Sequence, residues 1–178
     1  MYNKYIKAIT KIFGKEKQIY CCIEELSELI QSICKLKRYG NKKKYVDNFI
    51  EELTDSLITL EWYSDQILEE KNIYEKNSYE IEEFDKYIKE SHILDDLIIL
   101  ANNLINDISY INPNKPIKRN KDKYIKNLNI FMRYVYMYVI CFKTNEQDSI
   151  IDQITEDSIK YEAKFKMNRL KNNVLRRE

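Results

Sequence analysis

Residues that interrupt helices are scarce in this sequence. The 178 residues include only 2 glycines and 2 prolines, and both prolines lie in the stretch INPNKP at residues 111–116. Glycine and proline are the residues that most strongly end helices. The sequence also lacks a Gly-rich strand–turn–helix motif and an alternating apolar–polar strand pattern. These absences predict an all-α fold.

Strong charge asymmetry and long apolar runs are also absent. The 30 basic and 29 acidic residues give a net charge of +1. This balance provides no overall field to attract nucleic acid or an anionic membrane, so neither partner is expected.

The most apolar run, residues 130–142, contains an arginine and is shorter than the roughly 20 residues of a bilayer span. The N-terminal stretch is too short and too charged for a signal peptide, and we expect a cytoplasmic protein.

The sequence offers little for zinc binding or disulfide formation. The 4 cysteines, Cys21, Cys22, Cys34 and Cys141, include no CxxC pair. They are interpreted as small buried apolar residues in a reducing compartment. The single histidine, His92, lies at an expected helix start and is interpreted as a capping or surface residue rather than a catalytic base.

Apolar residues that recur every three or four positions predict a bundle of six to seven helices. We expect one domain with three parts: an acidic helical hairpin at 1–70, a charged connector at 71–90 and a second helical half at 91–178. The expected helices span residues 3–13, 15–38, 45–70, 91–111 and 121–142, with a basic loop at 41–44. A capping box at 144–147 predicts a last helix that runs to about residue 171.

Two pairs of carboxylates lie in the first half of the chain. Glu25 and Glu28 belong to the segment EELSELIQ, and Glu52 and Asp55 belong to EELTDSLITLE. A helix turns about 100° per residue, so two residues three positions apart lie about 60° apart on one face. On both expected helices the apolar residues occupy the neighbouring face. Packing the two helices together would bring four carboxylates to one place.

Four carboxylates from neighbouring helices are a suitable ligand set for magnesium. Mg²⁺ takes oxygen ligands in near-octahedral geometry and keeps positions for water and phosphate oxygens. Without a cation the carboxylates would repel one another and raise each other's pKa. Asp55 supports a metal site, because it interrupts an apolar and hydroxyl-bearing run in which an unpaired carboxylate is costly. The alternative is that both acidic faces are simply exposed to solvent.

The order Glu-x-x-Glu (25–28), basic loop, Glu-x-x-Asp (52–55), together with the spacing of the two patterns, resembles the MazG-like, all-α nucleoside triphosphate pyrophosphohydrolase superfamily. The resemblance covers residues 18–62 and is to members of the phage and Firmicute type. It implies a MazG-like four-helix core with additional C-terminal helices, and a homodimer. It also implies Mg²⁺, or Mn²⁺ in its place, bound by Glu25, Glu28, Glu52 and Asp55. The implied reaction cleaves a (deoxy)nucleoside triphosphate between the α- and β-phosphates, giving a monophosphate and pyrophosphate.

Four further residues are expected to bind the substrate. Gln18 and Lys35 lie on the same helix face as the first acidic pair. The family also carries a lysine and an asparagine on a later helix, where they reach the phosphates. The best match here is Lys164-x-x-x-Asn168, whose two side chains share a helix face.

The second half of the chain shows a weak likeness to the first. The segments NFIEELTDSLITLEWY (48–63) and KYIKNLNIFMRYVYMY (123–138) share an aromatic-Ile start and a long apolar body, but the second lacks the carboxylates. This is similar to dimeric dUTPases, in which one chain holds an active and a degenerate unit, although that branch's further motifs are absent. Any two amphipathic hairpins would also look alike. A protein that binds a nucleotide without cleaving it, and a helical interaction module, remain alternatives to an enzyme.

Overall fold

In the computed structural model, residues 14–69, 92–110 and 118–144 are described, and they form four α-helices. These helices are α2 (Lys15–Tyr39), α3 (Lys43–Gln66), α5 (Ile93–Tyr110) and α6 (Lys118–Thr144). No strand occurs in these three ranges, so the expected all-α fold is confirmed for this part of the chain. The helix expected at 3–13, the last helix expected to run to about residue 171 and the connector at 71–90 lie outside the described residues.

A short turn joins α2 to α3. Gly40 ends α2 with a φ of +74°, a conformation that glycine adopts without steric cost, and its N–H donates to the carbonyl of Leu36. The carbonyl of Lys42 then accepts the N–H of Tyr45 at 2.8 Å, which starts the next helix. The expected loop at 41–44 is therefore too long, because Lys43 already belongs to α3 and lysine is a good helix former.

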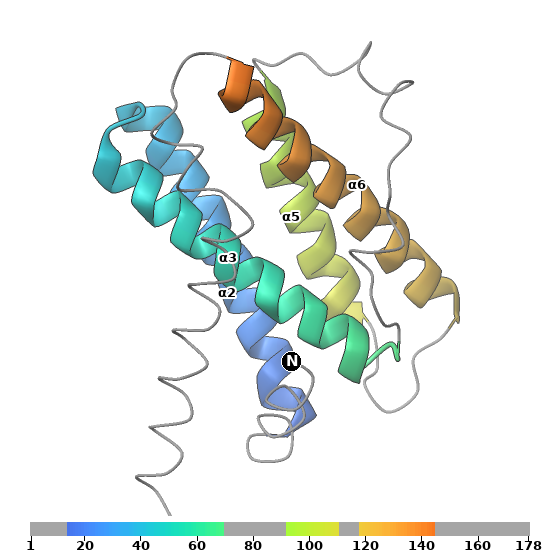
Figure 1. The fold of residues 1–178 in the computed structure, drawn as a ribbon. Coiled ribbons are helices and arrows are strands. Elements are labelled where there is room, and N and C mark those ends of the chain that lie inside the picture. The colour runs from blue at the N-terminus through green and yellow to red at the C-terminus, as the bar shows by residue number, and fades with distance from the viewer. Residues whose placement is uncertain (1–13, 70–91, 111–117, 145–178) are drawn as a thin grey trace, which may run out of the picture.

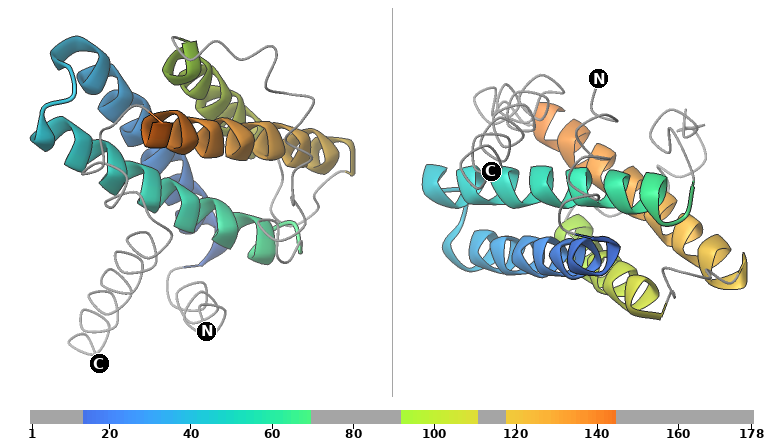
Figure 2. Two further views of the ribbon diagram at one scale, coloured as in Figure 1. Left: turned by 45° about the horizontal axis from the view of Figure 1, so that its top comes forward. Right: turned by 90° about the horizontal axis from the view of Figure 1, so that it is seen from below.

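The four helices form a bundle in which each helix has two neighbours (Figures 1 and 2). The antiparallel hairpin α2–α3 lies beside the hairpin α5–α6, and α2 also packs against α5. Aromatic rings join α3 to α6 and close the arrangement. One hydrophobic core contains side chains of all four helices, and its largest fully buried members include Tyr63, Tyr124, Phe49, Phe131 and Leu26.

The cysteines do not share one environment. Cys22 is fully buried, and burial raises the pKa of its thiol to about 12. Cys21 is half-buried and Cys34 is exposed. The expectation of a buried residue is therefore wrong for Cys34, which falls on the outer face of α2 beside the exposed Gln31 and Arg38. The side chain of Cys141 lies outside the described residues.

The two hairpins correspond position by position. When Lys118, the first residue of α6, is placed against Lys43, the first residue of α3, the similar segments 48–63 and 123–138 also align. We call this constant offset in residue number the hairpin shift. It also aligns α2 with α5, so that the buried Cys22, Leu26, Leu29 and Ile33 correspond to the buried Leu97, Ala101, Leu104 and Ile108.

Two ring contacts between α3 and α6 are reciprocal under this shift. Phe49 meets Tyr138 edge-on with ring centroids 5.4 Å apart, and Tyr63 meets Tyr124 at 5.0 Å. The hairpin shift relates Phe49 to Tyr124 and Tyr63 to Tyr138. The earlier residue of α3 meets the later residue of α6 in both contacts, so the two helices run antiparallel where their rings meet.

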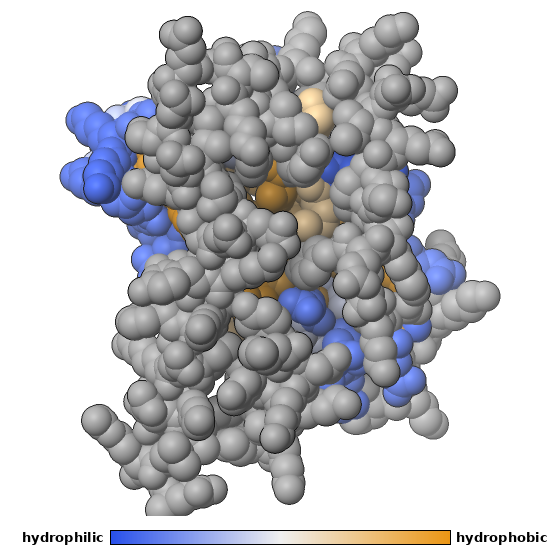
Figure 3. All heavy atoms as spheres, viewed as in Figure 1, coloured by the Kyte–Doolittle hydropathy of each residue, from blue (hydrophilic) through white to orange (hydrophobic). Residues whose placement is uncertain are grey.

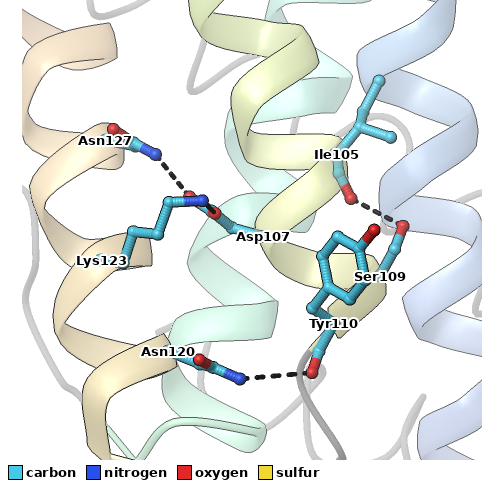
Figure 4. Close-up of polar contacts among 7 residues, drawn as sticks. All are labelled: Ile105, Asp107, Ser109, Tyr110, Asn120, Lys123 and Asn127. Atoms are coloured by element: carbon cyan, nitrogen blue, oxygen red, sulfur yellow. Dashed lines mark hydrogen bonds and ion pairs between the residues drawn. The ribbon is translucent and has the colours of Figure 1, made fainter.

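A buried carboxylate joins α5 to α6 (Figure 4). Asp107 of α5 is only 4% exposed, and it accepts hydrogen bonds from Lys123 Nζ and Asn127 Nδ2 of α6, each at 2.5 Å. The side chain of Lys123 is largely exposed, so its ammonium group stays hydrated while it reaches the carboxylate. Asp107 therefore depends on α6 for the charge and the hydrogen bonds that make its burial tolerable.

Substitution of Lys123 by methionine would leave Asp107 as a buried charge without its ammonium partner. We expect Lys123→Met to lower the free energy of unfolding by about 2 kcal/mol, the usual cost of a buried charged acceptor that loses its donor. Chemical denaturation measures this loss, and Asp107→Asn added to Lys123→Met should restore part of it. The control is Lys126→Met, an exposed lysine on the same helix. Equal stability of the two single variants would contradict the prediction.

Candidate metal site

The interface between α2 and α3 brings three carboxylates together. Glu25 comes from α2, and Glu52 and Asp55 lie one turn apart on α3. Each of them offers an oxygen within 4.8 Å of the other two, and all three residues are half-buried. Magnesium binds oxygens at about 2.1 Å, so small side-chain rotations would bring the three to one ion. Carboxylate oxygens are donors that suit a hard cation of this kind.

Glu28 has a different position from the other three residues of the expected ligand set. It is exposed, and it is not part of the group whose oxygens lie within 4.8 Å of one another. It nevertheless lies close enough to Glu52 to raise the pKa of that carboxyl group. The structure therefore places Glu25, Glu52 and Asp55 in one group and Glu28 at its rim.

A hydrogen bond between the helices fixes their register at this group. Ser56 is fully buried, and its hydroxyl donates to the main-chain carbonyl of Glu25 at 3.1 Å. Ser56 directly follows Asp55, so the contact holds the second acidic pair opposite the first. Leu26 and Leu53, which follow Glu25 and Glu52 in the sequence, are buried in the core below. The carboxylates are thus carried by rigid, packed segments of both helices.

Burial and neighbouring carboxylates affect the protonation of Glu52. Burial raises the pKa of Glu52, and the negative charges of Glu28, Glu51 and Asp55 add to the shift. A hydrogen bond from Asn48 opposes it. Protonation of a carboxyl group and binding of a cation would each relieve such repulsion.

A thiol lies at the edge of the group. Cys21 Sγ donates to Glu25 Oε1 at 3.8 Å from one turn earlier on α2. Burial, followed by the charge of Glu25, raises the pKa of the Cys21 thiol to about 12. The thiol therefore remains protonated at neutral pH and acts as a hydrogen-bond donor to Glu25.

On the other side of the group, a lysine and an asparagine extend towards the turn between α2 and α3. Lys35 Nζ donates to Asn48 Oδ1 at 3.4 Å, and Asn48 Nδ2 donates to Glu52 Oε1 at 2.8 Å. Lys35 was expected as a substrate ligand, whereas the acidic patterns do not single out Asn48. The available signal for Asn48 is its position one helical turn before Glu52.

The remaining expected substrate ligands are farther away. Gln18 is half-buried near the start of α2, two helical turns or about 10 Å along the axis from Glu25. Lys164 and Asn168 lie outside the described residues. Within the described part of the chain, the candidate site therefore consists of the carboxylate group, Glu28 at the rim and the Lys35–Asn48 pair.

Comparison of the chain with protein-family models, with curated proteins and with solved structures found no match. The resemblance to the MazG-like superfamily therefore depends on the acidic patterns themselves.

A separate finding concerns membranes: none of the helices in the described ranges is both long enough and apolar enough to span a bilayer.

Neutralising Glu52 should stabilise the metal-free protein. Because folding raises the pKa of Glu52 above its ordinary value of 4.5, protonation of this group favours the folded state. That stabilisation is complete below pH 4.5 and is lost as the pH rises through the raised pKa. Glu52→Gln keeps an acceptor for Asn48 and removes the charge. We expect it to raise the Tm at pH 7 by about 2–4 °C, and the gain should vanish in acid.

Thermal unfolding followed by circular dichroism measures this effect in the presence of a chelator. Glu24→Gln is the matched control, because Glu24 is an exposed glutamate of α2 outside the group. A Tm increase that is the same for both variants, or that does not depend on pH, would mean that Glu52 is not under repulsion.

Proposed function

We propose that the protein is a magnesium-dependent nucleotide pyrophosphohydrolase that converts a (deoxy)nucleoside triphosphate to the monophosphate and pyrophosphate. The main support is the group formed by Glu25, Glu52 and Asp55, whose oxygens approach within 4.8 Å across two helices. The resemblance of residues 18–62 to the MazG-like superfamily gives this group its proposed chemistry. The proposal includes a homodimer, which the same resemblance implies. It also includes a cytoplasmic location, and it excludes a nucleic-acid partner because the net charge is only +1.

Each residue of the site has a proposed role. Glu25, Glu52 and Asp55 would hold Mg²⁺, with Glu28 as a further ligand from the rim. When bound, the ion would polarise the phosphates and lower the pKa of a water molecule. A carboxylate that is not engaged with the ion could accept the proton of that water.

Positive charge on the hairpin would attract the phosphates. The overall net charge is only +1, but basic residues gather where α2 turns into α3, and the hydrophilic surface there is visible at the left of Figure 3. The exposed members of this basic end are Arg38, Lys42, Lys43 and Lys44. Lys35 lies between this end and the carboxylates, and in this proposal its amine contacts a phosphate oxygen. Gln18, Lys164 and Asn168 remain proposed substrate ligands.

We further propose a MazG-like four-helix core with additional C-terminal helices, in which α5–α6 is a degenerate copy of α2–α3. The matching buried positions of α2 and α5 under the hairpin shift and the likeness of 48–63 to 123–138 support this relationship. Under that shift, the positions of the four carboxylates are occupied by Leu100, Asn103, Asn127 and Ile130. One chain would therefore carry one metal site.

Removal of one metal ligand should abolish turnover. We expect Asp55→Asn to lower kcat/KM by roughly 100-fold or more, because loss of one carboxylate weakens both ion binding and its orientation. The assay incubates a panel of nucleoside triphosphates with Mg²⁺ and identifies the products by mass spectrometry. Retained helical circular dichroism shows that the variant is folded, and Glu24→Gln is the control for loss of a nearby negative charge.

Three results of this assay would contradict the proposed enzyme. Unchanged turnover in Asp55→Asn would place the active site elsewhere. Tight nucleotide binding by the wild type without products would indicate a protein that sequesters nucleotides. No binding, together with a Tm that Mg²⁺ and a nonhydrolysable nucleotide do not change, would indicate a helical interaction module.

A further inference from the structure

Both ends of the Asn48 side chain are used at the candidate metal site. Its Nδ2 donates to Glu52 Oε1 at 2.8 Å within α3, and its Oδ1 accepts from Lys35 Nζ at 3.4 Å across the interface with α2. Asn48 itself is half-buried. The amide therefore links a carboxylate of one helix to an ammonium group of the other.

This pair of contacts fixes the direction of the amide. An asparagine side chain can rotate by half a turn and exchange its oxygen and nitrogen. The rotated amide would point its oxygen at the Glu52 carboxylate and its NH₂ group at the Lys35 ammonium, which is unfavourable at both ends. Lys35 therefore selects the orientation in which Asn48 donates to Glu52.

The hydrogen bond from Asn48 in turn orients the side chain of Glu52. One carboxylate oxygen, Oε1, is held by the amide, so rotation of the carboxyl group is restricted and Oε2 remains for an ion. Hydrogen bonds of this kind to ligand carboxylates orient them and commonly change metal affinity by roughly 10–100-fold.

We infer that Asn48, itself oriented by Lys35, is a positioning residue that holds Glu52 in the arrangement that binds the divalent ion. This inference rests on the proposed metal site and adds a residue that the acidic patterns do not include. Asn48 acts through Glu52 and does not contact the ion.

The other hairpin uses the same two positions differently. The counterparts of Asn48 and Glu52 under the hairpin shift are Lys123 and Asn127. Both donate to Asp107 at 2.5 Å, so a lysine ammonium provides the positive charge there. The amide-to-carboxylate bond from Asn127 runs between α6 and α5, and its carboxylate also has a lysine partner, whereas the bond from Asn48 to Glu52 lies within α3 beside the carboxylate group.

The experiment measures the affinity of the full chain for Mn²⁺ alone, by calorimetry or by electron paramagnetic resonance, without any nucleotide. The variants are Asn48→Ala, Asn48→Leu, Glu52→Gln and the double variant Asn48→Leu/Glu52→Gln. We expect both single changes at Asn48 to weaken Mn²⁺ binding by roughly tenfold. In the Glu52→Gln background, Asn48→Leu should cause no further loss, because its effect passes through Glu52. Lys35→Met should cause a smaller loss in the same direction.

The matched control is Asn102→Leu, an exposed asparagine of α5 outside the site, and thermal unfolding checks that each variant is folded. An Asn48 variant that binds Mn²⁺ as tightly as the wild type would overturn the inference. An equal loss from Asn48→Leu with and without the Glu52 carboxylate would also overturn it, because Asn48 would then act independently of Glu52. Failure of the wild type to bind Mn²⁺ would instead overturn the proposed metal site, and with it the role of Asn48.

Discussion

Repulsion among Glu25, Glu52 and Asp55 is the constraint on which the site depends. Their oxygens lie within 4.8 Å of one another, although like charges at this distance favour separation. The packing of α2 on α3 prevents that separation, since buried leucines follow two of the acidic residues and Ser56 bonds the two helices together. Burial of the apolar side chains thus holds the three carboxylates close together despite their repulsion. A cation bound among them would relieve that repulsion.

The α2–α3 hairpin has a consistent order of contacts along its length. At the turn, the rings of Tyr39 and Tyr45 stack with centroids 4.9 Å apart. Next come Lys35 and Asn48, and then the carboxylate group. Positive and negative groups are therefore adjacent on one seam between two rigid helices. The proposed binding of an ion and its attached phosphates depends on this local arrangement, because the whole chain is almost neutral.

Much of the described fold could be predicted from the sequence, because periodic burial of apolar residues determines helices. Leu53 and Leu57 are buried as the pattern indicates, and all four described helices lie close to their expected ranges. Helix ends were less predictable, as Lys43 shows, because lysine is compatible with both a loop and a first helical turn.

The site was predictable only in part. Spacing places Glu25 and Glu28 on one face, but it does not determine which of them turns inward. That depends on the packing of α2 against α3, which brings Glu25 to the group and leaves Glu28 exposed. The role of Asn48 depends on a partner from the other helix, and a pattern within one helix cannot show it. The burial of Asp107 likewise follows from its partners on α6.

A crystal structure of the protein with Mn²⁺, with anomalous diffraction data collected near the manganese edge, tests the shared ion site most directly. We expect an anomalous peak at about 2.2 Å from one carboxylate oxygen each of Glu25, Glu52 and Asp55. A peak located elsewhere, or no peak at a Mn²⁺ concentration that saturates ordinary carboxylate sites, would show that the three residues form an acidic surface without an ion.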